Sequence, residues 1–456
     1  VAINNAGIVA GATIMTESPY TSLALRWGAT TTTPTTLYAI SLPFNTPIPR
    51  FAQDMNESGV IVGASATLSS ALSLTPAKWN ANTQNATALA NFADNPNTIA
   101  THITDTNFIG GITSSATLDN PVPDARPVRW NASGQISELA HLSTDVDGFS
   151  QSLITQMNNT GTAVGVAELY ANDGTDLGQR AVRWGANATS LTQLQAPDVS
   201  EAAAWESEAV GVNNAGVTIG NSFRGTDVTF EQRALRWQAD SASFELLRNT
   251  GNVETTESGA SAINNLGTIA GYANALNATA PHAVIWPKGS NIAVDLNSRI
   301  NLSGWELQAA THVSDTGFVA GLGMFDPDTS GPTAAYAKLF LMLVPEAGTY
   351  GMGDANFDTL VNFTDLLIVA QNYGQSNPNQ SFNVGDFDLN GTTDFLDLLP
   401  LAQNYGFAQM TNDQVDQLDQ FTSSFLNDWS MARANVPEPT LIALAPLTLI
   451  ALRRRR

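Results

Sequence analysis

A nine-residue pattern of apolar and polar positions recurs about every fifty residues along the first three-quarters of the chain. An apolar residue is followed by four mostly polar or small residues, and then by an apolar run that ends on Gly. The copies are INNAGIVAG (3–11), MNESGVIVG (55–63), ITDTNFIGG (103–111), MNNTGTAVG (157–165), VNNAGVTIG (212–220), INNLGTIAG (263–271) and VSDTGFVAG (313–321). Two apolar segments joined by four polar residues predict a β-hairpin in each repeat.

The four polar positions fit a type I turn closed by a bulge. The first turn position favours a short polar side chain that can hydrogen-bond back to the turn, and it is Asn4, Asn56, Thr104, Asn158, Asn213, Asn264 or Ser314. The fourth position needs a left-handed backbone, which Gly adopts freely and Asn tolerates. It is Gly7, Gly59, Gly161, Gly216, Gly267 and Gly317 in six copies and Asn107 in the third.

A second motif follows each hairpin by about 25 residues. It ends on an aromatic residue, and the position before this residue is usually Arg or Lys. The motif reads ALRW at Trp27, PAKW at Trp79, PVRW at Trp130, AVRW at Trp184, ALRW at Trp237, AVIW at Trp286 and AKLF at Phe340. A further apolar segment follows most copies, so each period predicts about four short strands.

Residues 1–344 therefore predict a mainly β repeat array. Both faces of strands such as GVIVG are apolar or tiny, which is typical of sheets buried on both sides. The blades of a β-propeller are buried in this way, and we expect seven blades with the Trp side chains in core packing. His102 and His312 hold the same position in their repeats, which favours a structural role.

The seventh repeat lacks the apolar segment that follows the aromatic motif in most other copies. We expect the corresponding strand to come from residues that precede Val1 and to close the ring. An open solenoid with distant ends would contradict this expectation.

The amino-acid composition limits which classes of function fit this protein. The chain of 456 residues carries 41 Asp and Glu against 19 Lys and Arg, a formal net charge of −22. Nucleic acid is therefore not an expected partner, because phosphate binding needs basic patches. There is no Cys, which excludes disulfides and thiolate metal sites.

The alternation of INNAG–VAG phrases with AVRW motifs resembles the HAF family of bacterial extracellular repeats. The last repeat, SGWELQAATHVSDTGFVAG with AKLFLMLVPE, resembles the terminal unit of such proteins. The resemblance covers about three-quarters of the chain. It implies an exported β-rich repeat domain and no defined reaction.

Residues 345–352 form a Pro- and Gly-containing linker, and a duplicated motif with a period of 32 residues follows at 353–406. The two copies read GDANFDTLVNFTDLLIVAQNYG (353–374) and GDFDLNGTTDFLDLLPLAQNYG (385–406). Each opens with an EF-hand-like spacing of oxygen ligands. Loop one offers Asp354, Asn356, Asp358, the Leu360 carbonyl, Asn362 and Asp365, and loop two offers Asp386, Asp388, Asn390, the Thr392 carbonyl, Asp394 and Asp397.

The duplicated motif resembles a type I dockerin domain. The resemblance implies two Ca²⁺ sites and a cohesin-like partner. Thr359 stands at the sixth loop position, where the pattern normally has Gly and loop two has Gly391. We therefore expect the second site to be the stronger one.

The C-terminal region, 407–456, predicts a helix and a sorting tail. Residues 411–432 predict one amphipathic helix with Thr411 and Gln414 as a capping box, which we expect to pack on the preceding module. Residues 436–456 combine VPEP, an apolar run of twelve residues and four arginines. This order resembles the PEP-CTERM signal that exosortase reads, and the run is short for a permanent membrane span.

These features together predict an exported protein of the cell surface or exopolysaccharide matrix. We expect a non-catalytic binding or structural role, because no nucleophile–base pair or close carboxylate pair stands out in the repeats. The alternatives are a carbohydrate-active hydrolase or lyase, and a propeller carried as cargo on a cohesin scaffold. Carboxylates or His at the mouth of the central channel would favour the enzyme.

Overall fold

The computed structural model describes residues 2–4, 6–13, 23–40, 50–68, 72–92, 97–114, 124–197, 206–225, 230–249, 257–274, 280–300, 303–329, 331, 334–344, 353–356, 360–376, 384–387, 392–405, 411–418 and 420–434. The chain divides into two compact units, Val1–Gly348 and Thr349–Arg456. The expected linker at 345–352 and sorting tail at 436–456 lie outside the described residues.

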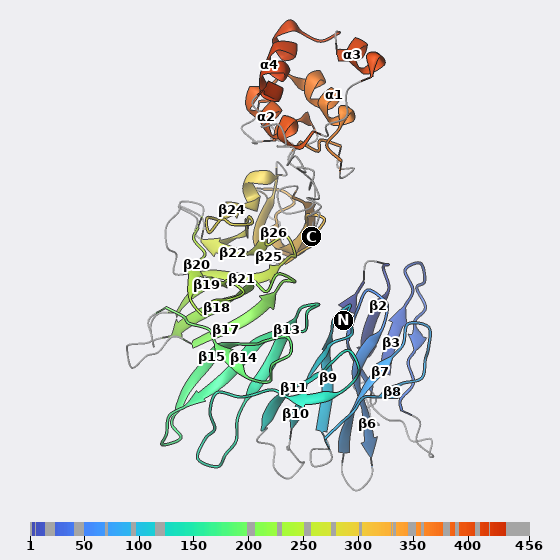
Figure 1. The fold of residues 1–456 in the computed structure, drawn as a ribbon, viewed down its shortest axis with the longest axis vertical. Coiled ribbons are helices and arrows are strands. Elements are labelled where there is room, and N and C mark those ends of the chain that lie inside the picture. Colours follow the sequence, from blue (N-terminus) through green and yellow to red (C-terminus); the bar gives the residue numbers. More distant parts are fainter. Residues whose placement is uncertain are drawn as a thin grey trace, which may run out of the picture. The chain divides into compact units, whose positions relative to one another are not determined.

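The first unit consists of seven antiparallel sheets in chain order (Figure 1). Sheet 1 contains β1 (Ala2–Ile3), β2 (Val9–Thr13), β3 (Leu23–Trp27) and β4 (Thr35–Thr36), and sheet 2 contains β5 (Arg50–Met55), β6 (Ile61–Leu68), β7 (Leu72–Trp79) and β8 (Thr87–Ala88). Sheet 3 contains β9 (Asn97–Ile103), β10 (Ile109–Ser114), β11 (Ala125–Trp130) and β12 (Ile136–Glu138), and sheet 4 contains β13 (Ser152–Met157), β14 (Ala163–Tyr170), β15 (Asp176–Trp184) and β16 (Leu191–Gln193). Sheet 5 contains β17 (Glu206–Val212), β18 (Thr218–Gly225), β19 (Phe230–Trp237) and β20 (Phe244–Leu246), and sheet 6 contains β21 (Ser258–Ile263), β22 (Ile269–Asn274), β23 (Pro281–Trp286) and β24 (Val294–Asp295). Sheet 7 contains β25 (Trp305–Val313), β26 (Phe318–Phe325) and β27 (Tyr336–Leu343), and the 3-10 helix η1 (Leu296–Arg299) precedes it.

The prediction of about four strands per repeat is confirmed for six sheets. The seventh sheet has three strands among the described residues, as the missing apolar segment predicts. The extensive contacts between described sheets all join chain neighbours. The array is therefore a seven-bladed, propeller-like repeat, whereas its closure through residues before Val1 stays a prediction.

The predicted hairpin turns are confirmed by their backbone angles. The fourth turn residue has a positive φ in every copy, from 64° at Asn107 to 95° at Gly267. The first turn residue accepts hydrogen bonds from within its own turn, as when Asn56 Oδ1 accepts from the Val60 N–H at 3.0 Å. Residues within each turn thus account for the position of each hairpin.

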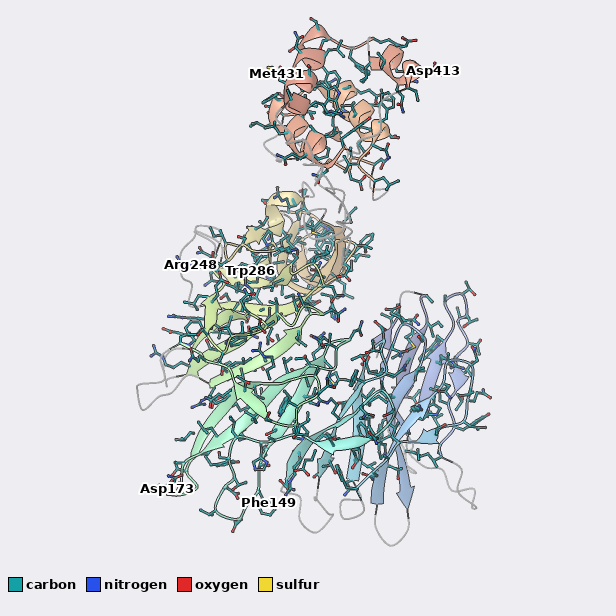
Figure 2. All side chains as sticks on the ribbon, in the orientation of Figure 1. Phe149, Asp173, Arg248, Trp286, Asp413 and Met431 are labelled. Carbon is teal, nitrogen blue, oxygen red and sulfur yellow. The ribbon has the colours of Figure 1, made fainter. Side chains whose placement is uncertain are left out.

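Hydrogen bonds that recur along the array join neighbouring sheets. Five of the six motif Trp side chains are fully buried, which confirms their core packing. Each of these five donates its indole N–H to a carbonyl of the preceding sheet's last loop; Trp286 donates to the Arg248 carbonyl at 2.8 Å (Figure 2). In sheets 1, 3, 4 and 5 the Arg before the Trp donates to the following sheet; Arg183, for example, donates to the Gln238 and Ser241 carbonyls at 2.9 and 3.0 Å.

The assignment of Phe340 as the seventh aromatic position is wrong by two residues. In the other sheets the Trp pairs with the second residue after the turn, as in Ile109↔Trp130. In sheet 7 the equivalent Val319 pairs with Met342, and Phe340 pairs with Gly321. The sequence pattern assigned the motif to Phe340 because sheet 7 has no Trp at the equivalent position.

The second unit is helical. It contains α1 (Phe363–Asn372), α2 (Phe395–Asn404), α3 (Asn412–Leu418) and α4 (Ser423–Ala434) around one apolar core. The single helix expected at 411–432 is thus two helices, because Thr422 starts a new helix by accepting from the Phe425 N–H with its hydroxyl at 3.3 Å. The capping box of Thr411 and Gln414 is confirmed, and Phe425 and Trp429 pack into the core as expected.

No helix among the described residues has the length and apolarity needed to cross a bilayer.

Candidate functional site

The predicted calcium ligands fall partly within the described structure. Asp354, Asn356, Leu360, Asn362 and Asp365 of loop one are described, and Asp358 is not. Asp386, Thr392, Asp394 and Asp397 of loop two are described, whereas Asp388 and Asn390 lie outside. Nothing in the described set groups three or more His, Cys, Asp or Glu side chains at metal-binding distance, so the sites stay predictions.

The first and last ligand positions of each loop are fully buried. These four carboxylates are Asp354, Asp365, Asp386 and Asp397. No Lys or Arg occurs between Leu339 and Met431 in the sequence. Burying charged carboxylates is costly unless a cation or hydrogen bonds compensate them, so these four side chains need hydrogen-bond donors or a cation.

Backbone N–H groups satisfy part of that need. Asp365 accepts from the Ala355, Asn356 and Asn362 N–H groups at 2.8, 3.1 and 2.9 Å. Asp397 accepts from the Phe387 and Asp394 N–H groups at 2.6 and 2.8 Å. Burial nevertheless raises the pKa of Asp365, and the nearby Asp354 charge adds to the increase while these hydrogen bonds oppose it.

The same residues start the helices, which sequence reasoning missed. Asn362 and Asp394 are the N-caps of α1 and α2, and Asp365 and Asp397 complete a capping box with each. The two residues of a capping box are three positions apart, and so are the last two ligand positions of the loop. A carboxylate oxygen has more than one lone pair, so capping leaves room for a metal, and the all-oxygen donor set fits a hard cation such as Ca²⁺.

A second candidate site is the mouth of the channel in the repeat unit. The second turn residues of sheets 2–7 form a chain of hydrogen bonds in which each backbone N–H donates to the side-chain oxygen of the next sheet. Glu57 donates to Asp105 at 2.9 Å, and Asn159 donates to Asn214 at 2.9 Å. Turn residues from these six sheets line a hollow of about 410 Å³, among them the acidic Glu57, Asp105 and Asp315 and no Lys or Arg.

The inner strands carry a third group of polar residues below this mouth. Each first strand of sheets 2–7 has a β-bulge just before its hairpin, and bulges re-aim side chains. The residue after the bulge is polar in sheets 2, 3, 4 and 7, where it is Asp54, His102, Gln156 and His312. The first three of these residues line a cavity of about 390 Å³. Sequence reasoning missed Asp54 because it lies outside the repeated phrase.

Asp54 and His102 influence each other electrostatically. Burial raises the pKa of Asp54, and the hydrogen bonds from the Ile103 and Met55 N–H groups oppose the increase. Burial lowers the pKa of His102, and the Asp54 charge partly offsets this. His102 Nδ1 lies 2.9 Å from Thr101 Oγ1. Asp54 Oδ2 accepts from the Ile103 N–H of the next sheet at 2.8 Å, so Asp54 also joins two sheets, and the expected structural role of His102 is compatible with this arrangement.

Comparison with known proteins finds a likeness in fold alone. No family model matches the chain, and no curated protein matches its sequence. Among solved structures, the polysaccharide lyase PL25 ulvan lyase aligns with a TM-score of 0.37 at 10% identity, covering 76% of this chain and 91% of that chain. The β-propeller domain of the Trilobed protease from Pyrococcus furiosus aligns with a TM-score of 0.39 at 9% identity, covering 75% and 91%. Polysaccharide lyase Uly1 aligns with a TM-score of 0.38 at 10% identity, covering 74% and 88%.

Proposed function

We propose that this protein is an exported, non-catalytic binding or structural protein of the cell surface or exopolysaccharide matrix. Its repeat unit, of the HAF type, contacts a polysaccharide, and its C-terminal, dockerin-like unit folds around Ca²⁺. The observation that carries the proposal is the set of four buried carboxylates in the C-terminal unit. An exosortase-type enzyme would act on the PEP-CTERM-like tail, and a cohesin-like domain is the expected partner of the C-terminal unit.

Calcium would be held in two places. Asp354, Asn356, Asp358, the Leu360 carbonyl, Asn362 and Asp365 would hold one ion, and Asp386, Asp388, Asn390, the Thr392 carbonyl, Asp394 and Asp397 the other. Bound Ca²⁺ supplies positive charge that compensates the buried carboxylates. Its binding free energy then adds to the free energy of unfolding of this unit.

Calorimetric titration of the chain with Ca²⁺ tests this assignment. We expect heat from two sites, with the stronger site lost in Asp397→Asn and the weaker one in Asp365→Asn. Asn keeps an acceptor oxygen for the capping hydrogen bond and removes the charge. Asp416→Asn is the matched control, because Asp416 is exposed on α3 outside both loops. Absence of binding at millimolar Ca²⁺ would refute the metal assignment.

The channel mouth supports a polar, uncharged polysaccharide as the ligand of the repeat unit. Amide, hydroxyl and carboxylate side chains line it, and its lining residues include no Lys or Arg. Sugar hydroxyls can pair with such groups, whereas uronate or sulfate groups would meet carboxylates of like charge.

A screen of neutral and anionic polysaccharides by affinity electrophoresis tests this ligand class. We expect retardation by neutral polymers that weakens in Asn214→Asp. This change keeps the oxygen that accepts the Asn159 N–H and replaces the NH2 group of a residue that lines the hollow. The melting temperature should therefore stay unchanged. Retardation by anionic polymers alone would contradict the assignment.

The alternative function, a carbohydrate-active hydrolase or lyase, is favoured by one observation. Asp54 and His102, an acid and a base, share the inner cavity, and burial raises the pKa of Asp54 and lowers that of His102, which favours the uncharged form of each. Polysaccharide cleavage that disappears in His102→Gln and persists in the exposed His312→Gln would establish this alternative over the binding role. The cargo hypothesis would instead require capture of the whole chain by a cohesin.

A further inference from the structure

Two cavities of the repeat unit adjoin each other. The hollow of the channel mouth has a volume of about 410 Å³, and the inner cavity that Asp54 and His102 line has a volume of about 390 Å³. Ile103, Gln156 and Met157 line both, so the inner cavity lies directly behind the mouth. Sites for small molecules usually enclose about 300–1,000 Å³. Mouth and inner cavity therefore form one site with two successive compartments.

The mouth presents similar groups from each of its six sheets. Hydrogen bonds fix these groups, since the Asn214 N–H donates to Asn265 Oδ1 at 3.0 Å and the Asn265 N–H donates to Asp315 Oδ1 at 2.7 Å. The first turn residue of sheets 2, 4, 5 and 6 also donates its amide to the next turn, as from Asn158 to the Asn213 carbonyl at 2.8 Å. A sugar that contacts only the mouth would find several similar places, so the mouth alone does not fix its orientation.

The inner cavity, in contrast, is polar on one side. Bulge residues and the residues after them supply six polar side chains from sheets 2, 3 and 4: Gln53, Asp54, Thr101, His102, Thr155 and Gln156. In sheets 5 and 6 the residues after the bulge are Gly211 and Ala262, which carry no polar side chain. This one-sided lining can fix the orientation of a sugar that the mouth leaves undetermined.

The polar side chains of the inner cavity are held in place and can still bind hydroxyl groups. Asp54 accepts from the Met55 and Ile103 N–H groups, each at 2.8 Å. Gln156 Oε1 accepts from the Val212 N–H at 2.7 Å. A carboxylate has about four acceptor positions, so Asp54 can accept further hydrogen bonds from sugar hydroxyls. The residues that line this cavity include no Lys or Arg, so an anionic sugar would find no such cation to pair with.

We propose that the channel recognises the end of a neutral polysaccharide, with the terminal sugar in the inner cavity and the next sugar in the mouth. This role rests on the proposed function of polysaccharide binding and specifies which part of the polymer is bound. Turn residues of six sheets surround the mouth, so a chain reaches the inner cavity with an end first, whereas an internal segment would have to fold back on itself. The number of chain ends, and not the chain length, then determines how many protein molecules one polymer binds.

Calorimetry with short and long chains tests end recognition. The probes are laminarihexaose, mannohexaose and maltohexaose and their parent polymers. We expect one protein molecule per linear chain and a similar affinity per chain for a hexasaccharide and its parent polymer. Several protein molecules on one linear polymer chain would overturn end recognition and leave polysaccharide binding in place. Absence of binding to all of these probes would overturn both.

Gln53→Trp tests whether the terminal sugar enters the inner cavity. Gln53 lines this cavity and is exposed, so an indole ring should fill the space without lowering the melting temperature. We expect the hexasaccharide to bind this variant at least about tenfold more weakly. Gln193→Trp is the matched control and should keep the native affinity, because Gln193 is exposed on β16 and lines neither cavity. An unchanged affinity in Gln53→Trp would overturn the proposal.

A measurement on the native chain locates the sugar independently of any variant. His102 lines the inner cavity, whereas His141 is exposed and lines neither cavity. Binding of the hexasaccharide should shift the imidazole ring signals of His102 in the NMR spectrum and leave those of His141 unchanged. Saturable binding without a shift at His102 would restrict the sugar to the mouth and overturn the proposal.

Discussion

Glycine at the ninth position of the repeated phrase is required by the bulge in the first strand of sheets 2–7. At Gly63, Gly165 and Gly220 a Cβ would overlap the carbonyl oxygen of Phe51, Leu153 and Glu208 respectively. The φ angles at these three positions are not left-handed, so the constraint is the close approach of two backbones. The turn glycines, in contrast, are required by their own positive φ.

Gly165→Ala should therefore destabilise the repeat unit by at least about 1–3 kcal/mol. The cause is the clash with the Leu153 carbonyl, which cannot be relieved by rotating a side chain. Urea unfolding followed by Trp fluorescence measures the change. Gly185→Ala is the control, because its Cβ would lie 3.6 Å from the Ala188 Cβ, and it should change stability by less than about 0.5 kcal/mol.

His102 should make the repeat unit less stable on mild acidification. Its pKa is lowered by burial, so below about pH 6.5 the unfolded chain binds a proton that the folded chain resists, and stability falls as pH decreases. The groups around it are Gln53 and Asp54 from β5, Thr101 on its own strand, and Thr155 and Gln156 from β13. The raised pKa of Asp54 has the opposite effect at lower pH, because it increases the stability of the folded state as the pH falls. The effect of His102 is therefore best measured between about pH 5.5 and 7.5.

Unfolding measured across that window should show a slope of at most about 1.4 kcal/mol per pH unit from this residue. His102→Gln should flatten the slope. His312→Gln, at the equivalent and exposed position of sheet 7, should leave the slope unchanged. Equal slopes in the native chain and in His102→Gln would show that this side chain does not govern the dependence.

At the scale of elements, hydrogen bonds join sheets 3, 4 and 5 to both of their neighbours. The Trp of each of these sheets donates to the sheet before it, and the Arg just before that Trp donates to the sheet after it. Trp184 reaches the Ala140 carbonyl at 2.8 Å, and Arg129 reaches the Gly161 and Gly185 carbonyls, each at 2.8 Å. Alternation along one strand sends the two side chains to opposite faces, which explains why Arg and Trp are adjacent in the sequence.

Trp184→Phe should destabilise the repeat unit by about 1–3 kcal/mol, because the buried Ala140 carbonyl would lose its donor. Trp27→Phe should cost less, because Trp27 is only half-buried and sheet 1 packs on no earlier sheet among the described elements. Thermal unfolding followed by circular dichroism compares the two. Equal losses would show that Trp27 is also enclosed in solution.

At the scale of the whole molecule, the two compact units have separate cores. Calorimetry should therefore resolve two unfolding transitions. Ca²⁺ at about 100 times its dissociation constant should stabilise the smaller unit by roughly 2.7 kcal/mol and leave the larger transition in place. A chain that ends at Gly348 should keep the larger transition at the same temperature. A calcium-dependent shift of both transitions would mean that the units unfold together.

The sequence alone determined the features that depend on neighbouring residues. The turn residues, the left-handed Gly and Asn107 positions, the strands that flank them and the capping box at Thr411 follow from local sterics and short-range hydrogen bonds. The period of about fifty residues also determined the number of sheets. Even the helix at 411–432 was predicted correctly except at Thr422, where a hydroxyl cap divides it.

Only the tertiary structure decided which distant residues meet. The bulges that place Asp54, His102 and Gln156 in one cavity depend on strand register, which no local pattern specifies. For the same reason, the residue that occupies the motif position in sheet 7 is Met342 and not Phe340. The burial of Asp354 and Asp386 and the exposure of Leu339 and Leu341 likewise depend on what packs around each side chain, because burial is a property of the assembled layers and not of any single segment.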